Sequence, residues 1–291
     1  MGKSKRVPVA LTIAGSDSGG GAGIQADLKT FAALGVHGTS ALTCITAQNP
    51  RQVLGIQACK PEIVRQQIEA VFAELRPAAV KTGMLYSAEI IRVVAEFFRT
   101  HGRTIDGRII FARDANIILP SIILSKHGSV PLVVDPVMMA TSGAWLLKKS
   151  AIDLLKKELL PLAALVTPNV DEAKILLGRD LKNIEDLRSA AKELHERFGC
   201  AALVKGGHLR GGKEAADIFY DGHNELLLTA PFIKGVSTHG TGCTYAAAIT
   251  AYLALGHVLP VAVELAKEHI TQAISRHQIV AGHAVLNNFW R

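Results

Sequence analysis

The chain has 291 residues, of which 49% are hydrophobic and 20% are charged, and this composition excludes a mainly disordered protein because disordered segments are poor in hydrophobic residues. Its 32 Lys and Arg residues against 25 Asp and Glu residues give a net charge of +7, which suits an anionic partner such as a phosphorylated metabolite or a nucleic acid. Only 5% of the residues are aromatic and no dense basic block follows Lys3–Arg6, so we expect no nucleic-acid partner.

Short apolar runs alternate with amphipathic helical segments along the chain. Six runs are expected to form buried strands: Val9–Ile13, Ala41–Thr46, Ala79–Thr82, Leu132–Asp135, Ala164–Thr167 and Ala201–Lys205. Hydrophobic residues recur at helical spacing in three segments between them: Glu62–Leu75, Ala88–Arg99 and Glu185–Phe198. An antiparallel hairpin is expected at Asp217–Tyr220 and Leu226–Thr229. This alternation is typical of a mainly parallel sheet covered by helices on both faces.

The chain contains no linker, repeat or low-complexity tract, so we expect one domain over residues 1–291. The segment 102–130 is the exception to the regular pattern. Its apolar runs Ile109–Phe111 and Ile117–Leu124 are interrupted by polar residues and by Pro120. We interpret this segment as a candidate insertion, either an extra hairpin or a short helix.

The stretch Thr244–Val263 resembles a membrane span because it contains no Lys, Arg, Asp or Glu. Gly256 and Pro260 interrupt it near its middle, which favours a buried central helix followed by a second, short helix. We therefore expect no membrane partner. The four cysteines form no C-x-x-C pair, and a reducing cytoplasm is the expected location.

Polar or glycine-containing segments follow all six expected strands. In open parallel sheets, ligands bind outside the carboxyl ends of the strands. The segments are Gly15–Gly23, Thr46–Asn49, Thr82–Met84, Asp135–Met138, Thr167–Asn169 and Lys205–His208. We expect a site at this edge of the sheet.

The common phosphate-binding motifs are absent. Gly15–Gly23 fits neither a dinucleotide-binding loop nor a Walker A loop. Gly207–Lys213 nearly matches a Walker A loop, but Glu214 replaces the required Ser or Thr. We interpret this segment as a turn into the next strand.

The strongest local signal is Ser237–Cys243, which precedes an alanine-rich helix. Gly240 and Gly242 allow consecutive N–H groups, including that of Thr241, to point inward, and the helix dipole adds partial positive charge. Cys243 lies at the same helix terminus, where thiol pKa values fall. A thiolate there would accept a proton from a substrate hydroxyl or attack a carbonyl. The alternative is a tightly packed helix start with an inert cysteine.

Four other polar residues at the strand ends each have two possible roles, one structural and one functional. Asn169 and Glu172 have the spacing of a capping box, and alternatively both face a nucleotide and its magnesium. Lys205 is either a solvated strand end or a point charge for phosphate. Asp135 either caps the turn at Pro136 or helps to hold magnesium through water.

Seven motifs in order resemble those of a known family. They are Ala14–Asp17 continued by Gly21–Phe31, then Ala47–Asn49, Lys81–Met84, Asp135–Met138, Thr167–Glu172, Val204–His208 and His239–Cys243. The set closely resembles the hydroxymethylpyrimidine/phosphomethylpyrimidine kinases of thiamine biosynthesis, in the ribokinase-like superfamily. The resemblance extends from about Val9 to Ser275.

This resemblance implies a three-layer α/β/α ribokinase-like fold and a homodimeric kinase that uses ATP and Mg²⁺. The family phosphorylates the hydroxymethyl group of the pyrimidine and then the resulting monophosphate. By position, the resemblance implies that Gln48 binds the pyrimidine ring in a pocket lined by Gly15, Met84 and Val137.

The resemblance also implies the roles on the phosphate side. Cys243 stands where most ribokinase relatives have an aspartate base, and Gly240–Gly242, with Thr241 between the glycines, form the anion hole. Asn169, Lys205 and Thr238 are implied on the nucleotide side. Glu172 and Asp135 are implied near magnesium.

One departure from the family pattern lies in the first loop. The family has Pro before Ser-Gly-Gly, where this chain has Ser18 after Asp17. Three alternative functions remain: a pyridoxal kinase with the same Cys-type motif, a catalytically silent ligand sensor on the same fold, and a thiol enzyme with Cys243 as nucleophile.

Overall fold

The computed structural model describes residues 6–101, 104–105, 108–109, 130–139, 145–147, 149–207, 214–233, 236 and 239–290. Its centre is an eight-stranded sheet with the order β12-β11-β10-β9-β8-β5-β1-β2. The strands are β1 (Val9–Ala14), β2 (His37–Leu42), β5 (Ala79–Thr82), β8 (Leu132–Val134), β9 (Leu165–Val166), β10 (Ala201–Lys205), β11 (Glu214–Tyr220) and β12 (Glu225–Pro231). The pairs from β2 to β10 are parallel, and β11 and β12 add an antiparallel edge.

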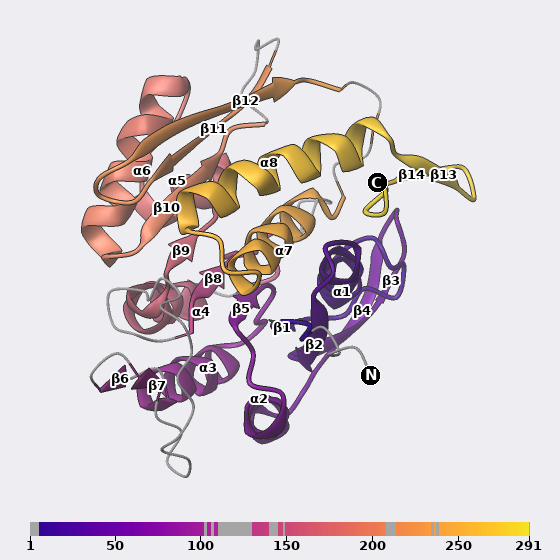
Figure 1. Cartoon of the computed structure of the whole chain (residues 1–291), viewed down its shortest axis with the longest axis vertical. Coiled ribbons are helices and arrows are strands. Elements are labelled where there is room, and N and C mark those ends of the chain that lie inside the picture. Colours follow the sequence, from indigo (N-terminus) through magenta and orange to yellow (C-terminus); the bar gives the residue numbers. More distant parts are fainter. Residues whose placement is uncertain are drawn as a thin grey trace.

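Helices cover both faces of this sheet, so the molecule has three layers (Figure 1). One face carries α1 (Gly23–Ala33), α7 (Thr241–Ala254) and α8 (Leu259–Ser275). The other carries α2 (Pro61–Glu74), α3 (Ala88–His101), α4 (Lys149–Leu154), α5 (Val170–Leu177) and α6 (Ile184–Phe198). A π-helical turn (Leu155–Leu159) and a 3₁₀ turn (Leu160–Leu162) continue α4.

Side chains alternate between two cores along each central strand. Leu11 and Ile13 of β1 face the core under α2 to α6, whereas Ala10 faces the core under α1, α7 and α8. Every residue of β5 is buried, as expected for a parallel strand that is covered on both faces. The hydrophobic runs in the sequence follow from this double burial.

Three two-stranded ladders lie outside the main sheet. The ladder of β3 (Cys44–Gln48) and β4 (Val53–Ala58) is antiparallel, as is that of β13 (Gln278–Val280) and β14 (His283–Val285). The third pairs β6 (Thr104–Ile105) with β7 (Arg108–Ile109). Most of the candidate insertion 102–130 lies outside the described residues.

Two sequence predictions are corrected by the structure. The predicted strand Ala41–Thr46 is wrong: the chain turns at Thr43, whose N–H donates to Ala14 O and whose hydroxyl donates to Met84 O. These bonds end β2 and direct β3 away from the sheet. The second helix expected in Thr244–Val263 is not short, because α8 has 17 residues.

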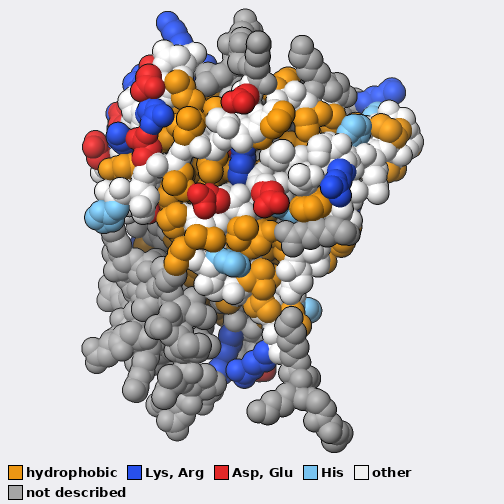
Figure 2. Space-filling view, turned by 45° about the horizontal axis from the view of Figure 1, so that its top comes forward, with side chains coloured by type: hydrophobic (Ala, Val, Ile, Leu, Met, Phe, Trp, Pro, Cys, Tyr) orange, Lys and Arg blue, Asp and Glu red, His pale blue; other side chains and the backbone are white. Residues whose placement is uncertain are grey.

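The other predicted helices and strands lie at or within a few residues of the expected positions. Among the described residues, no helix has both the length and the apolar character that a membrane crossing requires. Figure 2 shows acidic and basic side chains close together at the upper left of this face, and a smaller group of Lys and Arg side chains at its lower edge.

Candidate active site

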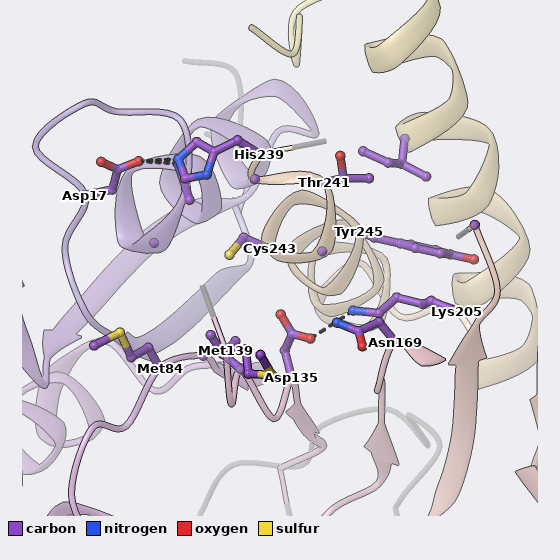
Figure 3. A pocket seen from close by; sticks show the side chains of 18 of the residues that line it. Asp17, Met84, Asp135, Met139, Asn169, Lys205, His239, Thr241, Cys243 and Tyr245 are labelled. Atoms are coloured by element: carbon purple, nitrogen blue, oxygen red, sulfur yellow. Dashed lines mark hydrogen bonds and ion pairs between the residues drawn. The ribbon is translucent and has the colours of Figure 1, made fainter. Parts of the chain in front are cut away.

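A cavity of about 1070 Å³ opens at the carboxyl ends of the parallel strands, where ligands bind in this class of sheet. Cys243 lies near its middle (Figure 3). Asp17, Met84 and His239 lie toward one end, and Asn169, Lys205 and Tyr245 lie toward the other (Figure 3). The cavity is large enough for two small molecules.

The start of α7 is a glycine nest. Gly240 is the N-cap residue and has a left-handed φ of 81°, a conformation that favours glycine. A Cβ atom there would also collide with the carbonyl oxygen of Gly21. The hydroxyl of Thr241 is buried and has no hydrogen-bond partner among the described residues. An unpaired buried hydroxyl at a helix N-terminus suits a phosphate oxygen.

The first glycine loop is organised by the Asp17 carboxylate. Its two oxygens accept hydrogen bonds from the N–H groups of Gly19, Gly21 and Ala22 at 2.8–3.0 Å. His239 Nε2 lies 3.0 Å from Asp17 Oδ2. Burial raises the pKa of Asp17, but the hydrogen bonds from His239, Ala22 and Gly19 outweigh this effect and lower it overall. Asp17 therefore remains a carboxylate and joins this loop to the nest.

Ser18 links the first loop to β3. Its hydroxyl donates to Gln48 O at 2.6 Å and accepts from Gln48 N at 2.7 Å. The side-chain amide of Gln48 lies 3.4 Å from His239 Nε2. Ser18 thus fixes the backbone of Gln48. The side-chain amide of Gln48 lies beside His239, and both residues line the cavity.

The sequence-based expectation for the Cys243 thiol is wrong. Helix termini lower thiol pKa values, but here burial raises the pKa of Cys243 to about 11, with Lys81 opposing the shift and Asp27 and Asp135 adding to it. The thiol is therefore largely protonated at neutral pH in the unliganded protein. Sequence spacing reveals the helix terminus and does not reveal the burial.

Lys205 and two carboxylates occupy the other end of the cavity. Lys205 Nζ donates to Asp135 Oδ1 at 3.0 Å (Figure 3). A Cβ atom on Gly242 would lie 3.2 Å from the same Nζ, so this ammonium lies directly under the nest. Burial would lower the pKa of Lys205, but Asp135 and Glu172 raise it. The group is a fixed positive charge beside the amides of the nest.

Glu172 forms the capping box that was one of its two predicted roles, and it also lines the cavity. Its Oε2 accepts from Asn169 N, and Asn169 Oδ1 accepts from Glu172 N, each at 2.9 Å, so the capping box is confirmed. Glu172 also lines the cavity. Burial raises its pKa to about 7, with Lys205 opposing and Asp135 adding to the shift. Burial and a second carboxylate disfavour the ionised form of such a group, and a nearby cation would favour it.

The residues at this end fit a magnesium ion that is held mainly by phosphate and water. No group of three or more His, Cys, Asp or Glu side chains suited to a metal occurs in the described part of the chain. Mg²⁺ characteristically keeps several waters and uses one or two carboxylates plus substrate phosphates. Asp135 and Glu172 supply two such carboxylates at the cavity wall.

The cavity brings together twelve of the thirteen residues that the sequence selected: Gly15, Gln48, Met84, Asp135, Val137, Asn169, Glu172, Lys205, Gly240, Thr241, Gly242 and Cys243. Thr238 lies outside the described residues. Val137 has a φ of 23°, which is strained for a β-branched residue. Such strain at a cavity wall is typical of functional sites.

The sequence analysis did not predict two pairs of interacting residues. Asp17 and His239 are separated by 222 positions, and Lys81 and Asp27 form a buried ion pair across 54 positions. All four lie within the motifs that carry the family resemblance. A Lys in the middle of an apolar strand is the one local signal that indicates a buried partner.

Comparison with known proteins identifies a family model and several similar kinases. The family model for phosphomethylpyrimidine kinase matches residues 17–121 and 110–287. A hydroxymethylpyrimidine/phosphomethylpyrimidine kinase of Rhizobium meliloti is 45% identical over 287 residues, which cover 97% of each chain. The bifunctional thiamine biosynthesis protein ThiED of Geobacter sulfurreducens is 44% identical over 96% of this chain, and the chain spans about half (51%) of its length.

Solved structures of two kinases share the fold. The phosphomethylpyrimidine kinase of Clostridium difficile has 40% identity and a TM-score of 0.74, covering 92% of this chain and 99% of that one. A pyridoxal kinase of Staphylococcus aureus in complex with AMP-PCP and pyridoxal has 32% identity and a TM-score of 0.80, covering 98% and 94%.

The three-layer fold and the anion nest at the sheet edge define a small-molecule kinase of the ribokinase-like class, which uses ATP as phosphate donor. Within that class, the chain belongs to the phosphomethylpyrimidine kinase family.

Substituting Glu172 with Gln should stabilise the protein above pH 7. The folded-state pKa of about 7 lies above the ordinary value of 4.5 for this side chain, so the folded state binds more protons between these values and stability falls as pH rises through them. We expect Glu172→Gln to raise the free energy of unfolding by about 1–3 kcal/mol at pH 8. Urea titrations at pH 5 and pH 8 measure it, and an equal effect at both would contradict the burial argument.

Substituting Gly240 with Ala should damage the nest more than the fold. A left-handed alanine costs about 1–2 kcal/mol, and the added Cβ collides with the Gly21 carbonyl, which would displace the amides of the nest. We expect kinase turnover to fall at least about tenfold. Gly178→Ala is the control, because Gly178 also has a positive φ but no atom within 4 Å of a Cβ; equal turnover of the two variants would argue against the nest.

Proposed function

We propose that this chain phosphorylates 4-amino-5-hydroxymethyl-2-methylpyrimidine with ATP, and then phosphorylates the monophosphate to the diphosphate, in thiamine biosynthesis. The observation that carries the proposal is the family match over most of the chain, together with 44–45% identity to kinases named for both steps. The position of the nest between the two ends of the cavity supports it.

The pyrimidine is proposed to bind at the end of the cavity near the first glycine loop. Gln48 offers an amide that can both donate and accept a hydrogen bond, which suits the adjacent ring nitrogen and amino group of an aminopyrimidine. Gly15 lies against Cys44, since a Cβ atom there would be 2.6 Å from the Cys44 sulfur. This leaves a flat surface for the ring beside Met84 and Val137.

Phosphoryl transfer is proposed to take place at the start of α7. The amides of Gly240–Gly242 and the Lys205 ammonium would bind the charged oxygens of the migrating group, and phosphoryl transfer depends mainly on such positioning and charge stabilisation. Cys243 would accept the proton of the substrate hydroxyl as its oxygen attacks. The thiolate of a cysteine with a raised pKa is a stronger base, but a smaller fraction of the protein molecules carries that thiolate at neutral pH.

ATP is proposed to occupy the end of the cavity near Asn169 and Lys205, with Thr238 beyond the described residues. Mg²⁺ would be held on this side through Asp135 and Glu172. When bound, it would neutralise phosphate charge that Lys205 alone does not balance.

The runner-up is a pyridoxal kinase. The higher TM-score of 0.80 for that kinase favours it, whereas the identity of 40% against 32% favours the phosphomethylpyrimidine kinase. We give more weight to identity, because a backbone superposition does not report the side chains that contact the ring. A silent sensor is disfavoured by the presence of the nest, Lys205 and Cys243 together.

The resemblance also implies a cytoplasmic homodimer. Leu54 of β4 and Ile279 of β13 are 69% and 66% exposed, and the two hairpins lie on the same side of the molecule (Figure 1). Exposed apolar side chains of this kind suit a second copy of the chain as partner.

Side-by-side assays test the proposed function. We expect ATP-dependent turnover of the hydroxymethylpyrimidine and of its monophosphate, with slower turnover of pyridoxal, because the Gln48 amide matches an aminopyrimidine edge. Coupled detection of ADP measures all three rates. Faster pyridoxal phosphorylation together with no reaction on the monophosphate would establish the runner-up instead.

Replacing Cys243 tests the proposed base. We expect Cys243→Ala to lower turnover about 10²-fold or more, the usual contribution of a positioned base. Cys243→Asp should recover at least about tenfold of this loss, because a carboxylate also accepts a proton. Steady-state rates at saturating ATP measure both variants. Near-normal turnover of Cys243→Ala would remove the residue from this role.

A further inference from the structure

A completely buried ion pair lies in the wall of the cavity beside Cys243. Lys81 Nζ donates to both oxygens of the Asp27 carboxylate at 2.9 Å, and both side chains are 0% exposed. The Thr12 hydroxyl donates to Asp27 Oδ2 at 2.6 Å. Two of the three Lys81 protons are thus used by Asp27.

The fold explains how these three residues meet. Thr12 and Lys81 are directly paired across the parallel strands β1 and β5, and both point to the face covered by α1 and α7. Asp27 lies one helical turn after Gly23 on α1. The backbone N–H of Gly23, at the start of α1, lowers the pKa of the Cys243 thiol. The same helix therefore holds the ion pair and the thiol.

Stability alone does not account for a charged pair at this position. Buried ion pairs gain little over well-packed apolar residues, because desolvation offsets their attraction. Ala10 and Ala79, their neighbours on this face, are small and apolar and pack into the core under α1 and α7. An apolar residue at position 81 would continue this pattern.

The two residues of the pair differ in their exposure to the cavity. Lys81 lines the cavity together with Cys243, whereas Asp27 does not line it. The charged groups that face the thiol are Lys81 on β5, Lys205 on β10, Asp27 on α1 and Asp135 after β8. The effect of Lys81 on Cys243 exceeds that of Asp27, so the two charges do not cancel at the sulfur.

We infer that Lys81, fixed by Asp27 and Thr12, is a positioning residue that stabilises the thiolate form of Cys243. This inference rests on the proposed function, in which the thiolate is the base. The substrate oxygen forms a bond to the γ-phosphorus while the bond from that phosphorus to the β,γ-bridging oxygen breaks and ADP leaves; the substrate O–H bond breaks and an S–H bond forms. Burial would lower the pKa of Lys81, but Asp27 raises it overall, so Lys81 keeps its proton throughout.

The thiol itself provides the test, without turnover. The rate of iodoacetamide alkylation at Cys243 follows the thiolate fraction, and mass spectrometry of the Cys243 peptide separates it from the other three cysteines. Across pH 7–11 we expect Lys81→Met to slow alkylation at a fixed pH at least about tenfold, which is one pKa unit. Slower alkylation in Lys81→Met supports the inference.

A second buried pair provides the matched control. Lys267 Nζ donates to Asp217 Oδ2 at 2.8 Å, and neither residue is among the charges that act on Cys243. Lys267→Met should leave the alkylation profile unchanged. Unchanged or faster alkylation in Lys81→Met would overturn the inference and leave the pair with a structural role.

A double variant without either charge keeps the inference testable if Lys81→Met alone does not fold. Lys81→Met combined with Asp27→Leu removes both charges and leaves only the Thr12 hydroxyl without its partner, and it should still slow alkylation because the effect of Lys81 is the larger of the two. Unchanged alkylation in this variant would also overturn the inference. If the alkylation profile shifts while the pH dependence of turnover does not, the inference about Lys81 holds and Cys243 is not the base.

Discussion

The contact between Gly240 and Gly21 is the constraint on which the arrangement of the site depends. No side chain fits between the two backbones, so the start of α7 and the first glycine loop meet as bare main chain. This contact directs the amides of the nest toward the cavity and keeps Cys243 at the first turn of the helix. Asp17 stabilises the opposite side of the contact by accepting three N–H groups of its own loop.

Around this contact, the buried charges are arranged in pairs. Lys81 is bound by Asp27 and Lys205 by Asp135, and Glu172 is left with an elevated pKa of about 7. The pairs keep two ammonium groups under the helix terminus at an acceptable desolvation cost. The carboxylates at the nucleotide end then suit a divalent cation that arrives with the substrate phosphates. The polarity of the cavity is therefore set largely before any ligand binds.

The sequence predicts the architecture well where burial is uniform. Ala79–Thr82 and Ala201–Lys205 are buried on both faces, so their hydrophobic runs coincide with the observed strands. Ala41–Thr46 fails because hydrogen bonds from Thr43 to distant residues divide a continuous run. The positions of the candidate site residues follow from the rule about strand ends, and twelve of them line one cavity.

The electrostatic properties of the site are not predictable in the same way. The Cys243 pKa depends on burial and on Lys81, and neither is visible in the spacing of the motif. The Lys81–Asp27 and Asp17–His239 pairs join residues that are far apart in the sequence. Local patterns identify residue types at an edge of the sheet, whereas their protonation depends on contacts that only the folded chain creates.

The double role of Glu172 links ligand occupancy to the end of a helix. Its carboxylate accepts the Asn169 N–H at the start of α5 and also faces the cavity. A carboxylate that turns toward a cation gives up part of this bond, and the released amide then exchanges its hydrogen with solvent more readily. The first turn of α5 is therefore a natural spectroscopic reporter of occupancy at the Asn169 end of the cavity.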